Sequence, residues 1–169
     1  MDASYFRQLA RYNGWANGRL YDVCTQLSDS ERKQPRSCFF GSIHRTLNHI
    51  LAGDRIWLAR ITGSEHGIAR LDQELYDDFG ELKAARVAED QRLVAAINAY
   101  DDARLAATLS YRNMAGEAVT APMAQVLGHI FNHQTHHRGQ VHALLSGTRV
   151  APPPLDLIYM GWGDSPGRR

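Results

Sequence analysis

Four long stretches of this chain repeat their apolar residues at the spacing of one face of an α-helix, and this repetition restricts the fold more than any other feature. The stretches run from about 4 to 27, 42 to 62, 81 to 100 and 122 to 146. Ser42 is a suitable N-cap, Gly63 a suitable stop, and Pro122 is acceptable in a first helical turn. The pattern predicts an all-α protein built as a four-helix bundle.

The segments between the helices differ in character. Residues 109–112 and 117–120 flank Asn113–Gly116, an arrangement typical of a small β-hairpin, here placed just before the last helix. Residues 63–80 have an irregular pattern and predict a long connection. The apolar tail Leu155–Trp162 should pack back on the domain or on a second subunit. With 169 residues, we expect one domain over 1–169.

Composition argues against several classes of function. The net charge is +1 and there is no basic block, so nucleic acid is not an expected partner. No apolar run approaches the roughly 18 residues of a membrane span, and the N-terminus does not resemble a signal peptide. Two cysteines make no disulfide framework, so we expect the cytoplasm. Cys24 lies on the apolar face of the first helix and should be a buried hydrophobe.

Five of the eight histidines lie in the last helix, and only some of them can face the same way. His133 and His137 are one turn apart, about 40° on the helical wheel, and both fall inside the apolar sector. His129 and His136 lie on the border of that sector, and His142 points away. Two buried imidazoles need polar partners, and a metal ion would satisfy both, although histidines that simply fill the core remain the alternative.

A metal site would need a third ligand from another helix. His49 ranks first by elimination, because His44 lies off the apolar stripe of the second helix and His66 lies in the long connection. A carboxylate is the competing choice, and Asp54 lies on the edge of the same stripe, where a salt bridge is its ordinary role. Gly53, one turn after His49, removes side-chain bulk where a ligand or substrate could sit.

Several motifs resemble one protein family in order along nearly the whole chain. They are Arg11–Asn17, Thr46–Ile50, Asp54–Trp57, Tyr111–Gly116 and, above all, Asn132–Gln140, which places a histidine four residues before His-Arg-Gly-Gln. In these motifs the chain resembles the DinB family of damage-inducible, YfiT-like metalloenzymes. The family name records induction by DNA damage and does not imply DNA repair by this chain.

The resemblance implies a four-helix bundle whose helix order departs from simple up-down-up-down. It also implies a divalent metal cofactor, zinc or nickel, held by three histidines, and a homodimer. Carried over position by position, the ligands are His49, His133 and His137. Some relatives resemble transferases or isomerases that use a low-molecular-weight thiol, so a small-molecule substrate of that kind is implied.

Three neutral imidazoles would leave one coordination position open, as in catalytic zinc sites, where the metal activates water or a thiol. Asn13, Asp54 and Gln140 are candidates to orient the rings, with an ordinary polar role at a helix contact as the alternative for each. Arg138 flanks the site and could meet an anionic group, but its wheel position favours the surface or a helix end.

Four aromatic residues could line a pocket beside such a site. They are Tyr12, Trp15, Trp57 and Trp162. Aromatic residues at helical spacing usually pack in the core, and for Trp57 we favour that role.

Three hypotheses follow. The first is a metal-dependent enzyme, a thiol transferase or hydrolase with an open three-histidine site. The second is a metal-binding, dimeric stress-response protein without catalysis. The third is a structural bundle in which the histidines only fill the core.

Overall fold

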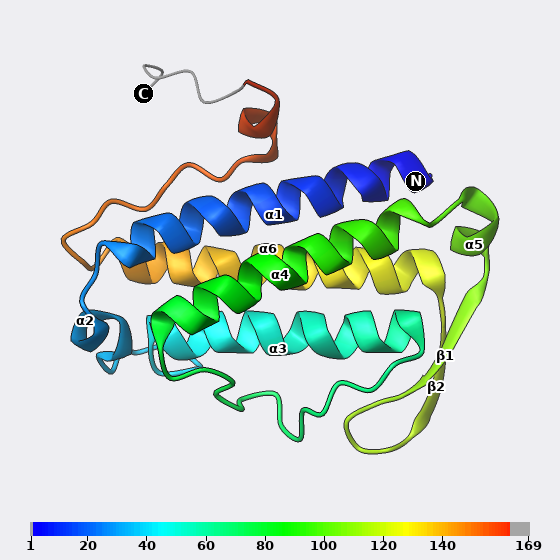
Figure 1. Ribbon diagram of the computed structural model, residues 1–169, viewed down its shortest axis with the longest axis horizontal. Coiled ribbons are helices and arrows are strands. Elements are labelled where there is room, and N and C mark those ends of the chain that lie inside the picture. The colour runs from blue at the N-terminus through cyan, green and yellow to red at the C-terminus, as the bar shows by residue number, and fades with distance from the viewer. Residues whose placement is uncertain (1, 163–169) are drawn as a thin grey trace.

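The computed structural model describes residues 2–162, and Met1 and residues 163–169 lie outside the described part. Four long helices form the body of the molecule and lie side by side in Figure 1. They are α1 (Ala3–Thr25), α3 (Ile43–Thr62), α4 (Phe79–Asn98) and α6 (Met123–Leu145). The prediction of a four-helix bundle is therefore confirmed. Among the described residues, no helix combines the length and the hydropathy that a membrane span requires.

The helices do not alternate in direction. In Figure 1, α1 and α6 run one way along the bundle, and α3 and α4 both run the other way. Because α3 and α4 are parallel, the chain must return along the full length of the bundle between them. Residues 64–78, which contain no regular element, make that return and explain why the connection is so long.

The helix ends follow from local hydrogen bonding. The Ser42 hydroxyl accepts from the backbone N–H of Arg45 at 3.1 Å, which caps the start of α3. Gly63 ends α3 with φ 72°, a left-handed conformation that favours glycine. Pro122 directly precedes α6, where its missing N–H removes one unpaired donor. The signals at Ser42 and Gly63 are confirmed, whereas Pro122, predicted within the first turn, is the N-cap residue before it.

Two short helices and a final 3₁₀ turn were not anticipated. They are α2 (Asp29–Lys33), α5 (Asp102–Ala106) and η1 (Leu157–Trp162). Ser28, which follows the first predicted helix, starts α2: its hydroxyl accepts from the N–H of Glu31, and the Glu31 carboxylate accepts from the N–H of Ser28. Five residues are too few to show a helical period, so periodicity could not reveal this element.

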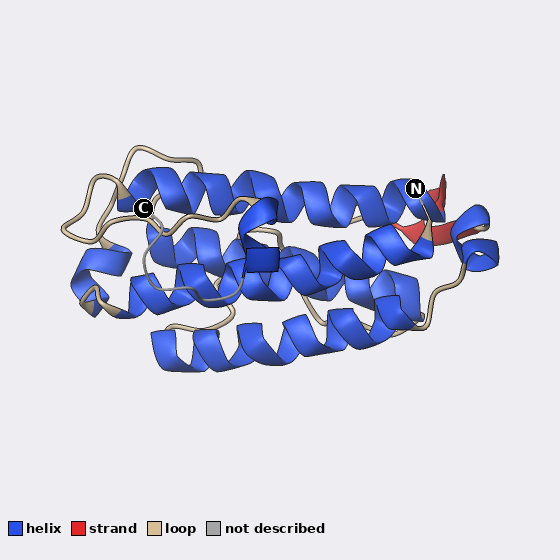
Figure 2. Ribbon diagram, turned by 90° about the horizontal axis from the view of Figure 1, so that it is seen from above, coloured by secondary structure: helices blue, strands red, loops and turns tan. Residues whose placement is uncertain are grey.

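The predicted β-hairpin is present at one end of the bundle (Figure 2). Strands β1 (Thr108–Arg112) and β2 (Ala118–Pro122) pair antiparallel, with Tyr111 opposite Val119. Gly116 in the turn has φ 82°. The Tyr111 ring lies 5.2 Å from the ring of Trp57 near the end of α3, so the hairpin is anchored to the bundle.

The interior of the described part consists of two large apolar clusters with a polar layer between them, and of a small third cluster formed by Ala52, Ile56 and Ile68. The first cluster is formed by residues such as Phe6, Ile61, Leu93, Ile97, Leu127 and Ile130. The second is formed by residues such as Leu20, Cys24, Leu47, Leu82, Val141 and Leu145. Each helix contributes its first half to one cluster and its second half to the other, so its middle turns supply the polar layer.

The centre of the polar layer is an ion-pair chain. Arg86 lies 2.7 Å from Asp54 and 2.9 Å from Asp90, and its side chain is 1% exposed. Asn13 and Asn17 donate to the Asp90 carboxylate at 3.2 and 2.9 Å. Burial raises the pKa of both carboxyl groups, and the facing guanidinium opposes that rise. The charge of Arg86 thus faces the two carboxyl groups within the layer, as a buried charge requires, while its Nε has no hydrogen-bond partner among the described residues.

The first part of the C-terminal tail packs back on the domain, which is one of the two predicted outcomes, whereas the side chains of Leu157, Ile158 and Tyr159 are exposed. The chain runs along α1 after residue 150 (Figure 1), and the Tyr12 hydroxyl donates to the carbonyl of Leu155 at 2.7 Å. The Leu155 side chain packs against the second apolar cluster.

Candidate metal centre

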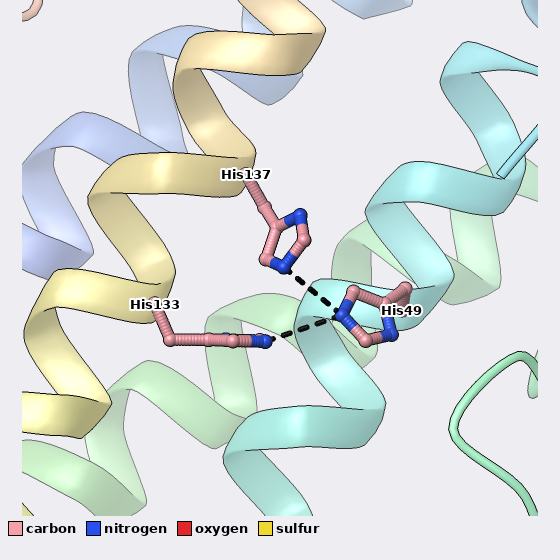
Figure 3. Close-up of side chains that lie close together, drawn as sticks. All are labelled: His49, His133 and His137. Atoms are coloured by element: carbon pink, nitrogen blue, oxygen red, sulfur yellow. Dashed lines mark hydrogen bonds between the residues drawn. The ribbon is translucent and has the colours of Figure 1, made fainter. Parts of the chain in front are cut away.

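Three histidine rings from two helices meet between α3 and α6 (Figure 3). Nε2 of His49, on α3, lies 3.2 Å from Nε2 of His133 and 3.2 Å from Nε2 of His137, both on α6. One ligand atom from each ring lies within 4.8 Å of the others. The one-turn spacing of His133 and His137 brings both rings to the side of α6 that packs against α3.

The outer nitrogens of two rings are already hydrogen bonded. Nδ1 of His49 lies 2.8 Å from the carbonyl of Leu71, and Nδ1 of His137 lies 2.8 Å from Oε1 of Gln140. Both partners are acceptors, so each Nδ1 carries the proton and each Nε2 carries a lone pair. The contact of 3.2 Å between these two Nε2 atoms therefore joins two acceptors and is no hydrogen bond, although Figure 3 marks it as one. A cation between them would relieve the repulsion.

The ring of His133 fits into space that α3 leaves open. A Cβ atom at Gly53 would lie 2.8 Å from Cε1 of His133, closer than real contacts allow. Nδ1 of His133 is buried and has no hydrogen-bond partner among the described residues. The space expected at Gly53 for a ligand or substrate is thus occupied by the His133 ring.

All three imidazoles are held in the neutral form. Burial lowers the pKa of His49 and His137, and burial together with the neighbouring histidines lowers the pKa of His133 to about 3. Neutral imidazole is the form that binds a metal, because the ring nitrogen must offer a lone pair.

The donor set fits a divalent ion. Tetrahedral zinc with Zn–N bonds of about 2.0–2.1 Å separates two nitrogen ligands by about 3.3 Å. The two separations of 3.2 Å are close to that value. Imidazole suits zinc and nickel alike, so the geometry allows a metal site without identifying the metal.

Sequence reasoning missed two contacts of His49. The Phe40 ring stacks on the His49 ring with centroids 4.0 Å apart and lies 5.6 Å from the His137 ring. The Leu71 carbonyl that fixes the His49 tautomer lies in the long connection. Both residues lie in loops, whose path depends on the packed bundle, so no periodic signal could have found them.

The structure places the residues expected to orient the rings in two different environments. Gln140 accepts from His137 and so lies where a supporting residue should. Asn13 and Asp54 do not reach the rings, because they are bound within the polar layer, Asn13 to Asp90 and Asp54 to Arg86. Asp54, considered as an alternative ligand, is therefore occupied by a buried cation.

The surface position expected for Arg138 is wrong. Its side chain is buried, and its guanidinium donates to Asn13, Asn17 and Gln134. The helical wheel was centred on the face of α6 that meets α3, but α6 also packs against α1. Arg138 lies on the second buried face. Its side chain therefore supports the polar layer and is not available to contact a substrate.

The aromatic residues that could have lined a pocket are dispersed, and Trp57 packs against the first apolar cluster, the role favoured for it. Trp15 lines a groove of about 560 Å³ between α1 and α4. Tyr12 is bound to the tail, and Trp57 packs on the hairpin and on His129, with ring centroids 4.9 Å apart. His129 lies 5.8 Å from His133, so Trp57 approaches the histidines through one intervening ring. The side chain of Trp162 lies outside the described residues.

Comparison with known proteins agrees with the fold. The model of the DinB family matches residues 1–167. The chain belongs to the DinB family. A curated relative, the protein DinB of Bacillus subtilis (strain 168), is 25% identical over 160 residues, which cover 90% of this chain and 92% of that protein.

A solved structure shows the same DinB fold. The crystal structure of a DinB-like protein from Bacillus cereus ATCC 10987 superposes with a TM-score of 0.71 at 20% identity and covers 90% of this chain and 97% of the other. At that identity the likeness supports the fold alone.

Proposed function

We propose that this chain is a metal-dependent enzyme in which His49, His133 and His137 hold one divalent ion, zinc or nickel. The observation that supports it is the meeting of three Nε2 atoms. Two of them, those of His49 and His137, each carry a lone pair and lie 3.2 Å apart. An ion bound by three histidines with a position open for a further ligand supplies a nucleophile, hydroxide or thiolate, at neutral pH.

The protein's own groups prepare the ligands. The Leu71 carbonyl and the Gln140 amide oxygen hold the protons of His49 and His137 on Nδ1, so both Nε2 atoms stay available. Burial lowers the pKa of all three rings and so favours the neutral form, which offers a lone pair to a metal. The site is therefore ready before a metal arrives.

The proposed reaction is the transfer of a small electrophile to a low-molecular-weight thiol, or the hydrolysis of such a substrate. The ligand number supports a catalytic role, because structural zinc sites close all four positions with protein ligands. The competing function is a metal-binding stress-response protein without turnover, as a homodimer in either case.

The test begins with elemental analysis of protein purified without a histidine tag. We expect about one zinc or nickel ion per chain in the wild type, none after His133→Ala, and full occupancy after His142→Ala on the far side of α6. If the wild-type protein contains no metal, only the third hypothesis remains, a structural bundle in which the histidines fill the core.

Turnover then separates the two metal-binding hypotheses. Loaded protein is incubated with a low-molecular-weight thiol and a panel of alkyl halides and epoxides. Activity that a chelator abolishes and added metal restores supports the enzyme. Stoichiometric metal without turnover on the panel supports the stress-response protein. Sedimentation at several concentrations measures whether either form is a dimer.

A further inference from the structure

An exposed aromatic residue lies beside the histidine cluster. The side chain of Phe39 is 88% exposed, the most exposed of the large apolar side chains in the described part of the chain. Its ring lies 4.9 Å from the ring of Phe40, and the Phe40 ring stacks on His49. A continuous series of aromatic contacts therefore runs from solvent to the candidate metal ligands.

A second loop brings another apolar side chain to the same histidine. The Leu71 backbone accepts the hydrogen bond from Nδ1 of His49, while its side chain is 48% exposed. Phe40 thus covers the face of the His49 ring and Leu71 lies at its outer edge. Two loops far apart in sequence, 37–42 and 64–78, both present apolar groups to solvent at this place.

Two of the cations close to these loops, Arg70 and Arg45, are already paired. Arg70 forms a two-point ion pair with Asp72, and Arg45 lies 3.8 Å from Glu74. Arg138 is buried in the polar layer. Arg36, next to the first loop, forms no ion pair among the described residues, and its guanidinium lies beside Gln34 and Gly147, past the end of α6. The rim around His49 therefore offers apolar and aromatic surface, which suits an uncharged group.

We propose that Phe39, Phe40 and Leu71 form the substrate subsite of this centre and select an uncharged electrophile that has an aromatic ring next to its reactive carbon. Exposed apolar surface beside a reactive centre marks a place that a ligand covers, and aromatic rings favour edge-to-face packing such as Phe39 and Phe40 already show at 77°. The inference rests on the proposed function, whose substrate class it names.

The reaction on such a substrate is a substitution at a benzylic carbon. The sulfur lone pair of the thiol forms the C–S bond, the carbon–halogen bond breaks, and the halide leaves with the bonding pair. The thiol proton passes to the buffer, so a thioether, a halide ion and a proton are the products.

The first test compares two electrophiles with the same leaving group, benzyl chloride and chloroacetamide. Phe39→Ala should lower kcat/KM for benzyl chloride about tenfold and leave kcat/KM for chloroacetamide unchanged. Met114→Ala, which removes an exposed apolar side chain at the hairpin turn, is the matched control and should change neither value. Equal losses for both electrophiles would overturn the subsite.

The second test needs no turnover. Binding of 2-naphthalenemethanol, an unreactive aromatic probe, is followed by NMR on metal-free and on zinc-loaded protein. We expect shifts at Phe40 and Leu71 that Phe39→Ala weakens about tenfold. Binding without any turnover would support the subsite while the proposed enzyme fails. Turnover of benzyl chloride without such binding would overturn the subsite and leave the enzyme intact. A change of sedimentation after Phe39→Ala with unchanged probe binding would assign Phe39 to a subunit contact and also overturn it.

Discussion

The ring of His133 on α6 fills the place where any residue but glycine at position 53 of α3 would put its Cβ, only 2.8 Å from Cε1 of that ring. The absence of one side chain on α3 therefore sets the position of a candidate ligand on α6. A metal site tolerates displacements of its ligands of only about 0.5 Å. A substitution at Gly53 therefore tests whether His133 is a ligand of the centre.

Gly53→Ala should lower the affinity for zinc at least about tenfold, because the added methyl group must displace the His133 ring. Affinity is measured by competition with a chromophoric chelator. Gly128→Ala on α6, where a Cβ meets nothing within 4 Å, is the control. It should leave zinc affinity unchanged and raise the free energy of unfolding by about 0.5–1 kcal/mol. Equal zinc affinity in both variants would contradict the geometry.

Gln140→Ala should weaken metal binding by about tenfold to a hundredfold, because His137 loses the acceptor that fixes its tautomer. Gln140→Glu keeps an acceptor oxygen at the same reach and should restore most of the affinity. The same chelator competition measures both. If the two variants bind metal equally, the hydrogen bond has no role at the site.

Metal-free protein should lose stability as the pH falls below about 6.5. Burial lowers the pKa of His133 to about 3 in the folded state from an ordinary value of 6.5, so between these values the unfolded chain binds the proton and the folded chain does not. The free energy of unfolding is therefore unaffected above pH 6.5 and reduced by about 2 kcal/mol at pH 5.

Urea unfolding at pH 7 and pH 5 measures this effect. His133→Asn removes the group with the largest downward pKa shift and should make the pH dependence shallower than in the wild type. A wild-type curve that is already flat between the two pH values would show that His133 is not held neutral.

Arg86→Met should lower the free energy of unfolding by about 3–5 kcal/mol, because Asp54 and Asp90 would remain as buried charges without a counter-ion. Arg92→Met, which removes an arginine that is 58% exposed and pairs with Glu89, should cost about 1 kcal/mol or less. Denaturant unfolding compares the two. If both substitutions lower the free energy of unfolding by a similar amount, stability does not depend on the charge balance of the polar layer.

Much of the bundle could be predicted because its signals are local. The apolar repeat located the four long helices, and Ser42, Gly63 and Pro122 located helix ends, since capping depends on neighbours a few residues away. The short helix α2 was not predicted, because its five residues are too few to show an apolar period. The wheel misplaced Arg138 because one helix packed on two neighbours has two buried faces.

The sequence by itself determined that His133 and His137 share one face of a helix, because a turn of 3.6 residues fixes their relation wherever the helix lies. Only the tertiary structure decided that His49 meets them, that Gly53 leaves room for one ring, and that Leu71 and Phe40 reach another. Those contacts join residues up to 88 positions apart. Their distances depend on how α3 and α6 pack and on the path of the loops, which no local pattern specifies.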